Sequence, residues 1–479
     1  MNSVQVDVAI IGAGTAGIAA YRAARAAGAN VAIIEGGDYG TTCARVGCMP
    51  SKLLIAAAGA AHAVSKAADF GIHVDGPIRI DGSQVMDRVR SERDRFVGFA
   101  LREVHDIPVA NRIRGHARFV NNHTLEVAEH TRVTSKCVVI ATGSNASYPD
   151  SFGALGDRLI ISDDVFAWQS LPKSVAVIGL GIIGLELGQA LHRLGVRVAV
   201  FGRGGHVGPI SDPEIATYAS AAFNAEFTLE PDAHITTMEP DGNRVVIRRT
   251  APNGTQETEY FDYVLAATGR TPNLADIGLE KTTLVRDAKG LPSFDPVTTR
   301  TVSAEGASPI FIAGDASSFI PLLHEAADEG HIAGGNAARL ASGKPLIAGL
   351  RRAPIGIVFT DPQIAIVGGG FRSMEAGTFA TGQVSFEDQG RSRIQLQNKG
   401  LLNVYADIAT GRFLGAEMLA PGAEHLAHLL AWALQNKMFV AQMRAMPFYH
   451  PVIEEGLRTA LRDLDVKLRA AQANVNQAV

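Results

Sequence analysis

Patterns of buried strands and helices alternate along the first two thirds of the chain, and one arrangement occurs twice. Residues 6–11 (Val-Asp-Val-Ala-Ile-Ile) predict a buried strand, an alanine-rich helix extends to Ala27, and residues 30–35 predict a second strand. The same order recurs 167 residues later, counted from Gly12 to Gly179, with strand, helix and strand at residues 174–178, 185–194 and 197–201. This internal repeat predicts two βαβ units.

Each predicted unit carries three glycines between its first strand and its helix. The two sets have the same spacing: Gly12, Gly14 and Gly17, and Gly179, Gly181 and Gly184. Glycines here let the backbone approach a pyrophosphate, which then sits at the helix N-terminus. One such fingerprint is weak evidence, but strand, glycines, helix and strand in this order, twice, predict two dinucleotide-binding sites.

The residues after the second strand differ between the two units. Glu35 lies 23 residues after Gly12, where a carboxylate can accept hydrogen bonds from a ribose 2′-OH. The matching position, 23 residues after Gly179, is Gly202, and Arg203 follows it. A cation beside a missing acceptor favours the 2′-phosphate of NADPH over NADH. Arg203 as a solvated turn residue is the alternative.

Later strands end in residues suited to a ligand crevice. Two strands run into Ala-Thr-Gly, at Thr142-Gly143 and at Thr268-Gly269, and a third, at residues 310–313, ends at Gly314-Asp315. The carboxyl ends of parallel strands face the ligand in α/β folds. After residue 345 alternating segments at 364–367, 401–405 and 413–418, with helices at 423–436 and 452–463, predict an α+β domain.

Composition narrows the class of protein. The chain of 479 residues is 47% hydrophobic and 19% charged with a net charge of −4, which predicts a multidomain globular protein and no nucleic acid partner. We expect no membrane-spanning segment, because no run of 18 apolar residues occurs, and no secretory signal. Three cysteines fit a reducing, cytoplasmic location.

Two of those cysteines, Cys43 and Cys48, lie shortly after the first fingerprint. Residues five apart on a regular helix are roughly 8–9 Å apart, and a disulfide needs less than about 7 Å. A bridge therefore requires a distorted helix start, for which Gly47 supplies freedom. Such a bond would be exchangeable. The alternatives are two small buried hydrophobes or half of a zinc site, for which no second pair occurs at ligand spacing.

These features resemble the pyridine nucleotide-disulfide oxidoreductase family, which includes lipoamide dehydrogenase, glutathione reductase and mercuric reductase. The resemblance runs from about residue 5 to residue 463 and includes Cys-x4-Cys-x-Pro-Ser-Lys and His450-Pro451 with Glu455. It implies an α/β fold with two Rossmann-like domains, for FAD and NAD(P), and a C-terminal α+β dimerisation domain. The implied boundaries are 1–150 and 273–345 for the FAD and central parts, 151–272 for NAD(P), and 346–479 for dimerisation.

The resemblance also assigns roles. It places FAD at Gly12, Gly14, Gly17, Glu35, Thr142, Gly143 and Asp315, and NAD or NADP at Gly179, Gly181 and Gly184. Further candidate cofactor-binding residues are Lys52, Arg203, Gly269 and His324. Cys48 resembles the thiolate that contacts the flavin, and Cys43 the one that exchanges with substrate. Lys52 and Glu186 match an ion pair near the reactive flavin nitrogen. His450 and Glu455 match an acid–base pair that reaches the partner subunit of a homodimer.

Residues 322–330 and 46–52 are most similar to lipoamide dehydrogenases. Mercuric reductases usually carry extra cysteines near the C-terminus, whereas the third cysteine of this chain is Cys137, in a predicted strand. Dihydrolipoamide, presented on a 2-oxo-acid dehydrogenase complex, is therefore the first substrate to consider. Arg45 between the thiols departs from the family pattern and can lower a thiolate pKa. Arg45 and Arg203 together favour an alternative function, an NADPH-driven reductase of another disulfide. A complex subunit or redox sensor is the third reading.

Overall fold

The computed structural model describes residues 1–251 and 253–477, with side chains described to residue 473, and divides into two compact units. The first comprises residues 1–53, 87–147 and 270–351, and the second comprises 54–86, 148–269 and 352–479. The helices α3 (Cys48–Lys66) and α4 (Gly82–His105) contribute to both. The predicted domain boundaries are finer than this division and stay predictions.

The first unit is built on an eight-stranded sheet with the order β17-β18-β6-β1-β2-β3, extended by β5 and β4. Its strands are β1 (Asn2–Ile11), β2 (Val31–Glu35), β3 (Arg112–Arg114), β4 (Ala117–Asn121), β5 (Thr124–Val127), β6 (Thr131–Ile140), β17 (Arg300–Ser303) and β18 (Gly306–Ile312). The central pairs are parallel, so the carboxyl ends of β1, β2, β6 and β18 share one edge. A small sheet pairs β7 (Ser144–Ala146) with β16 (Arg270–Pro272).

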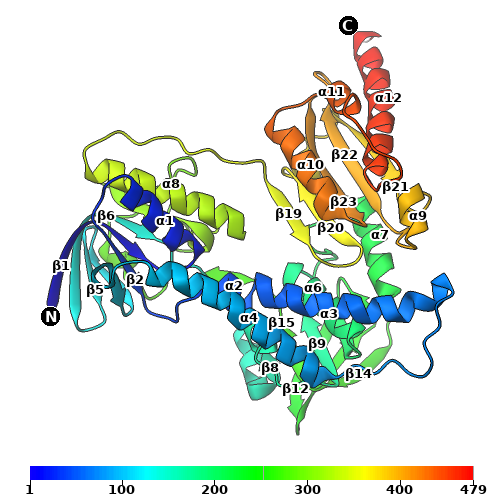
Figure 1. Ribbon diagram of the computed structural model, residues 1–479, viewed down its shortest axis with the longest axis horizontal. Helices are drawn as coiled ribbons and strands as arrows, with labels where there is room; N and C mark the ends of the chain where they lie inside the picture. The colour runs from blue at the N-terminus through cyan, green and yellow to red at the C-terminus, as the bar shows by residue number, and fades with distance from the viewer. Residues whose placement is uncertain (252, 478–479) are drawn as a thin grey trace. The chain divides into compact units, whose positions relative to one another are not determined.

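The centre of this sheet is buried on both faces, which explains why β2 and the ends of β1 and β6 are continuously apolar. Val8 and Ile10 face a core shared with the helices α1 (Thr15–Ala26) and α8 (Leu323–Ala341), which lie side by side (Figure 1). Ala9 and Ile11 face a second core that includes residues of β4 and β5. The predicted helix and strand of the first repeat are thus confirmed, although β1 begins four residues earlier than the pattern indicated.

The second unit contains an all-parallel sheet of order β11-β10-β9-β15-β8. Its strands are β8 (Leu159–Ile160), β9 (Ser174–Ile178), β10 (Arg197–Phe201), β11 (Thr228–Glu230) and β15 (Tyr263–Ala266). One face packs against an antiparallel sheet of β12 (His234–Asp241), β13 (Arg244–Thr250) and β14 (Gln256–Phe261). The helix α6 (Ile182–Arg193) contacts β9 and β10. Two further helices of this part are α5 (Ser162–Val165) and α7 (Pro213–Asn224).

The C-terminal part of the second unit has an antiparallel sheet of order β19-β20-β23-β22-β21. Its elements are β19 (Ile355–Val358), β20 (Gln363–Val367), β21 (Phe379–Ser385), α9 (Gly390–Ile394), β22 (Leu401–Asp407), β23 (Phe413–Ala420), α10 (Ala423–Gln435), α11 (Val440–Arg444) and α12 (Glu455–Gln477). The helix α10 packs on β20 and β23, and α12 packs on β21 and β22. The predicted α+β domain is confirmed.

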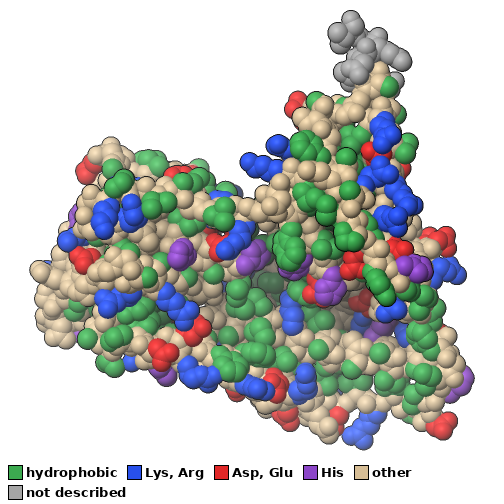
Figure 2. Space-filling view, turned by 45° about the horizontal axis from the view of Figure 1, so that its top comes forward, with side chains coloured by type: hydrophobic (Ala, Val, Ile, Leu, Met, Phe, Trp, Pro, Cys, Tyr) green, Lys and Arg blue, Asp and Glu red, His purple; other side chains and the backbone are tan. Residues whose placement is uncertain are grey.

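Hydrophobic side chains also gather on the surface of this C-terminal part (Figure 2). On α10, Leu429 is 43% exposed and Trp432 is 67% exposed. An exposed apolar surface is a candidate for contact with another protein only where such side chains form a contiguous patch.

Short helical segments complete the chain: α2 (Thr42–Val46) and the 3-10 turns η1 (Ala67–Phe70), η2 (Val109–Asn111), η3 (Asp150–Arg158), η4 (Leu279–Lys281), η5 (Gly314–Ser317) and η6 (Phe371–Ser373). Of the described residues, one helical stretch, Thr42–Phe70, is long and apolar enough to cross a membrane by length and composition alone, which is weak evidence. The sequence analysis expected no such stretch. It contains Lys52 and is interrupted at Gly47, and the absence of a membrane partner stays a prediction.

Candidate functional site

The first glycine fingerprint makes a tight turn between β1 and α1. Gly12 has φ +106°, and a Cβ there would lie 2.2 Å from the carbonyl oxygen of Ala141. A Cβ at Gly17 would lie 1.8 Å from the oxygen of Gly12. Gly14, the N-cap of α1, faces open space, with nothing within 4 Å of an added Cβ. Two glycines therefore serve close packing, and the third leaves room at the helix N-terminus for a phosphate.

Glu35 ends β2 with its carboxylate fixed by two backbone donors. Oε2 accepts from the amide of Ala13 and Oε1 from the amide of Gly37, both at 2.7 Å. The first bond links the end of β2 to the fingerprint turn. The carboxylate retains lone pairs for the hydroxyls of a ribose, so the geometry suits a 2′-OH acceptor.

Thr142, Gly143 and Asp315 meet at the same edge of the sheet. The strands before them pair in parallel, with Ile140 opposite Ile312. Asp315 Oδ2 accepts from the Ser144 hydroxyl at 2.6 Å. The Thr142 hydroxyl is buried without a hydrogen-bond partner among the described residues. A buried hydroxyl without a partner, at the same edge of the sheet as the first fingerprint, fits a polar ligand such as FAD.

Sequence reasoning missed the residues that hold Asp315. Arg270 Nε donates to the Ser144 hydroxyl at 2.8 Å, and its Nη2 donates to the carbonyl of Ser144. Asn273 donates its side-chain amide to the carbonyl of Thr142. Arg270 directly follows the second Ala-Thr-Gly, so its position in that motif was a signal.

Cys43 and Cys48 lie on either side of a helix break. The helix α2 ends at Val46, Gly47 has φ −124° and ψ −117°, and α3 begins at Cys48. The distorted helix start that the sequence predicted is thus present, and both cysteines carry free thiols. A Cβ at Gly47 would lie 3.1 Å from the oxygen of Thr42, so a larger residue would crowd the break.

The two thiols interact directly. A hydrogen bond with Cys48 raises the pKa of the Cys43 thiol, and burial raises it further, whereas the charge of Lys52 lowers it. The Arg45 guanidinium, which the sequence suggested for this role, binds the Asp38 carboxylate at 3.0 Å and the carbonyl of Tyr39 at 3.2 Å. The lowering by a neighbouring cation thus comes from Lys52 on α3. Two thiols this close can form a disulfide by losing two protons and two electrons, and reduction returns both.

The second fingerprint repeats the geometry of the first. Gly179 has φ +117°, and a Cβ there would lie 2.3 Å from the oxygen of Ala267, while one at Gly184 would lie 1.9 Å from the oxygen of Gly179. Gly181 faces open space, as does Gly269. The space at the N-terminus of α6 fits a pyrophosphate.

The corner after β10 has no space for a carboxylate. A Cβ at Gly202 would lie 2.7 Å from the oxygen of Pro231 and 2.9 Å from Leu180 Cδ1. Arg203 is exposed beyond it, and the Gly204 amide donates to Asp232 Oδ1 at 2.8 Å. Close packing at position 202 therefore excludes the acidic side chain that the first unit has at the matching position.

Glu186 and Lys52, the predicted ion pair, belong to different units, so their pairing stays a prediction. Glu186 is 4% exposed on α6, and its Oε1 accepts from the amide of Phe359 at 2.9 Å. His324 begins α8 in the first unit, 46% exposed at its side chain, with Nε2 4.0 Å from Glu325 Oε1. Neither His324 nor Glu186 has its predicted role tested.

His450 and Glu455 are paired in the second unit. His450 Nδ1 lies 3.0 Å from Glu455 Oε2, and the hydrogen bond to His450 holds the pKa of that carboxyl below its usual range. The helix predicted over residues 452–463 begins later than the pattern indicated, because α12 starts at Glu455. Residues 450–454 form a turn instead, which Glu455 closes by accepting from the amide of Val452. The His450 side chain is 81% exposed.

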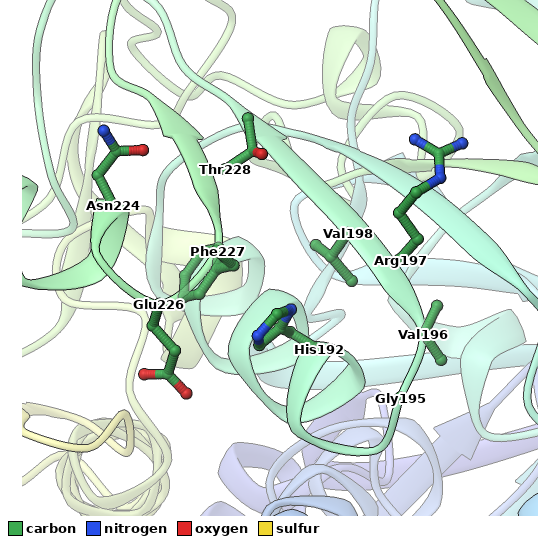
Figure 3. Close-up of a pocket in the computed structure, with 9 residues that line it drawn as sticks. All are labelled: His192, Gly195, Val196, Arg197, Val198, Asn224, Glu226, Phe227 and Thr228. Carbon is green, nitrogen blue, oxygen red and sulfur yellow. The ribbon is translucent and has the colours of Figure 1, made fainter.

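A cavity of about 560 Å³ lies at the opposite end of the parallel sheet (Figure 3). Its lining includes Gly195 and Val196 before β10 and Phe227 before β11, hence the amino ends of the strands. Arg197 is engaged by Glu259, and Glu226 by Arg193. Because ligands of such sheets bind at the carboxyl ends, this cavity is not the dinucleotide site.

The sites divide between the two units. The first holds the first fingerprint, Glu35, the cysteine pair, Thr142-Gly143 and Asp315, and the second holds the second fingerprint, Arg203, Glu186, His450 and Glu455. Among residues 1–251 and 253–477, no three His, Cys, Asp or Glu side chains are grouped to hold a metal ion.

Comparisons with known proteins match most of the chain. Residues 6–330 match the family model described as pyridine nucleotide-disulphide oxidoreductase, and residues 355–461 match the dimerisation domain of that family. The chain is 30% identical to a mercuric reductase from Acidithiobacillus ferrooxidans, over 97% of this chain and 84% of that protein. It is 30% identical to a dihydrolipoyl dehydrogenase from Haloferax volcanii, over 95% of both.

Two solved structures share the fold. LpdA from Mycobacterium tuberculosis has a TM-score of 0.79 at 24% identity, covering 96% of this chain and 99% of that one. The HOCl-induced flavoprotein disulfide reductase RclA from Escherichia coli, as a Cu(II) complex, has a TM-score of 0.79 at 22% identity, covering 97% and 99%.

These matches confirm the predicted fold class and the predicted cofactors FAD and NAD(P), and the dimerisation domain supports a homodimer. They leave the substrate and the roles of single residues open, because relatives of equal identity have different names. The chain therefore belongs to the pyridine nucleotide-disulphide oxidoreductase family and is a flavin-dependent enzyme of that family.

Proposed function

We propose that the protein is a dihydrolipoyl dehydrogenase-like enzyme that passes electrons between a small dithiol, the Cys43/Cys48 pair, FAD and NAD(P). The observation that supports this most is the pair itself, two hydrogen-bonded thiols at a helix break in the unit that carries the first fingerprint. The third cysteine, Cys137, is buried in β6, so Cys43 and Cys48 are the thiols that a substrate can reach.

The proposed reaction with dihydrolipoamide begins from the Cys43–Cys48 disulfide. A substrate thiolate attacks Cys43 Sγ, the S–S bond breaks, and Cys48 leaves as a thiolate. The second substrate thiol then attacks the substrate sulfur of the mixed disulfide, which closes the lipoamide ring and releases Cys43. Two electrons thus move from the substrate to the cysteine pair. Bound FAD supplies the chemistry that transfers them as a hydride to NAD(P)⁺.

His450 is the proposed base. Its Nδ1 faces the Glu455 carboxylate, so a proton on Nδ1 is held there and Nε2 is left to take the substrate proton. Because the imidazole ring is highly exposed, it is accessible to a substrate that is bound by another part of the enzyme. In a homodimer, that site would belong to the partner subunit.

The cofactor roles follow the geometry. Gly14 and Glu35 in the first unit, with Thr142 and Asp315, are the proposed FAD site. Gly181 and Arg203 in the second unit are the proposed NAD(P) site.

An NADPH-dependent reductase of another disulfide is the second candidate. It is favoured by the packing that keeps an acidic side chain out of position 202 and by the exposed Arg203 next to it. A flavoprotein that acts chiefly as a complex subunit or redox sensor would share these features but would not turn over alone.

Steady-state assays with dihydrolipoamide and NAD⁺ or NADP⁺, and with NADH or NADPH and a panel of disulfides, test the proposal. Fast lipoamide turnover without other proteins supports the leading proposal. NADPH oxidation with another disulfide and little lipoamide activity would move the assignment to the second candidate, and no turnover with any disulfide would favour the third.

A further inference from the structure

A buried carboxylate lies directly beneath the Gly314-Asp315 turn. Glu329, on α8, has no exposed surface. Its Oε2 accepts from the Gly314 amide at 2.8 Å and from the Ser317 hydroxyl at 3.3 Å. Both donors belong to η5, the turn that carries Asp315.

Arg351 is the cation that binds this carboxylate. Both of its terminal nitrogens lie 3.1 Å from Glu329 Oε1, and Nη2 also binds Glu325 Oε2 at 2.8 Å. Burial raises the pKa of Glu329, while the Gly314 amide and Arg351 act against that rise. A carboxylate so deeply buried is stable only with these partners.

The turn above Glu329 has little freedom to move. Gly314 has φ +68°, and an added Cβ would lie 3.0 Å from the Cβ of Ala16 and 3.3 Å from that of Ala326. The residue after Glu329, Gly330, packs so closely on α1 that an added Cβ would lie 2.2 Å from the oxygen of Ala16. The same segment of α8 therefore supports the fingerprint helix α1 and the Asp315 turn.

We propose that Glu329, bound by Arg351, is a positioning residue of the flavin site, which sets the place of Asp315 through the Gly314 amide. This inference rests on the proposed role of Asp315 toward FAD. Glu329 touches no ligand in this account. It acts by removing the freedom of the turn, so that the Asp315 carboxylate is in place before the cofactor binds.

The test compares Glu329→Gln with Glu325→Gln, a matched control. Both variants remove one carboxylate partner of Arg351, but only the first changes the acceptor of the Gly314 amide. Holoenzyme is stripped of flavin, and FAD rebinding is followed by the quenching of flavin fluorescence, alongside melting of the apoprotein. We expect the FAD Kd of Glu329→Gln to rise roughly tenfold or more, and that of Glu325→Gln by less than about threefold.

Equal FAD Kd values for the two variants would overturn the inference, because a purely structural ion pair predicts similar loss from either partner. Asp315→Asn is the reference: if it binds FAD as the wild type does, the proposed role of Asp315 fails instead. Ser317→Ala covers the case that Glu329→Gln does not fold: it removes a hydroxyl donor to Glu329, together with the acceptor of the Phe319 amide at 3.2 Å. It should raise the FAD Kd roughly two- to fivefold, and an unchanged Kd would count against Glu329.

Discussion

The two βαβ units share one turn and differ in what holds their helices. After the first fingerprint, the backbone of α1 packs directly on the backbone of α8. A Cβ at Gly330 or Gly334 of α8 would meet a backbone carbonyl of α1, that of Ala16 or Ala20 respectively. After the second, α6 is held by side chains: Gln189 and Arg193 reach Asp361 in the turn between β19 and β20. The two units therefore have the same glycine turn at the proposed dinucleotide site, but the contacts that hold the helix after that turn differ between them.

The corners that face the ribose also differ. In the first unit Glu35 is locked by the amides of Ala13 and Gly37, so a neutral ribose hydroxyl is the ligand that it suits. In the second, packing against Pro231 leaves only glycine at position 202 and an exposed cation at 203. In the first unit Glu35 can accept hydrogen bonds from the ribose. In the second, Arg203 either donates to a 2′-phosphate or makes no contact with the nucleotide.

The largest effect should come from the side-chain support of α6. Arg193 is 8% exposed and binds both Glu226 and Asp361. Arg193→Met would leave a mostly buried Glu226 without its cation, and we expect a loss of about 3 kcal/mol in the free energy of unfolding, at the low end for a broken buried pair because Asp361 is partly exposed. Urea unfolding monitored in the second unit measures it. A loss under about 0.5 kcal/mol would show that the network is dispensable.

The backbone support of α1 should be nearly as sensitive. Gly330→Ala places a Cβ 2.2 Å from a carbonyl oxygen, so α8 must shift, and we expect a loss of about 2–3 kcal/mol with weakened FAD retention. Gly188→Ala on α6 is the matched control, because its Cβ would meet side-chain methyl groups of Val200, at 2.9 Å, and Val198, at 3.9 Å, and no backbone carbonyl. Thermal melting and flavin content report both. Equal effects of the two substitutions would remove the distinction between the two helices.

Nucleotide choice tests the second corner. If Arg203 binds a 2′-phosphate, Arg203→Glu should lower the ratio of kcat/KM for NADPH to that for NADH roughly 10–100-fold, through loss of a charge-assisted contact of about 1.5–3 kcal/mol. FAD content should not change. An unaltered ratio would make Arg203 a solvated turn residue.

The smallest effect concerns Cys137. Burial raises the pKa of this thiol to about 12, from 9.0. Because the folded pKa lies above the unfolded one, the protonated thiol contributes stability below pH 9.0 that is lost as the pH rises toward 12. A thiol reagent at pH 8 should therefore label Cys137 only after unfolding. Labelling of Cys137 in the folded protein at the rate of a free thiol would contradict its burial.

Local patterns predicted most of this molecule. The repeat of strand, glycines, helix and strand gave both βαβ units, because close backbone approach admits no residue but glycine at Gly12 and Gly179. The break at Gly47 followed from the reach of a disulfide. Contacts distant in the sequence could not be predicted: Ser144 and Arg270 beneath Asp315 are 126 residues apart. The start of α12 was also misplaced: the pattern predicted a helix from residue 452, but Glu455 closes a turn there by accepting from the amide of Val452, and the helix begins at Glu455.

The most direct test of the account is the Cys48→Ser enzyme, assayed for dihydrolipoamide oxidation and for NAD(P)H-dependent reduction of an artificial electron acceptor. The account predicts that the variant keeps its flavin and reduces the artificial acceptor, while thiol turnover falls to background, because no disulfide can form with Cys43. Thiol turnover near the wild-type rate would contradict the central role of the Cys43/Cys48 pair.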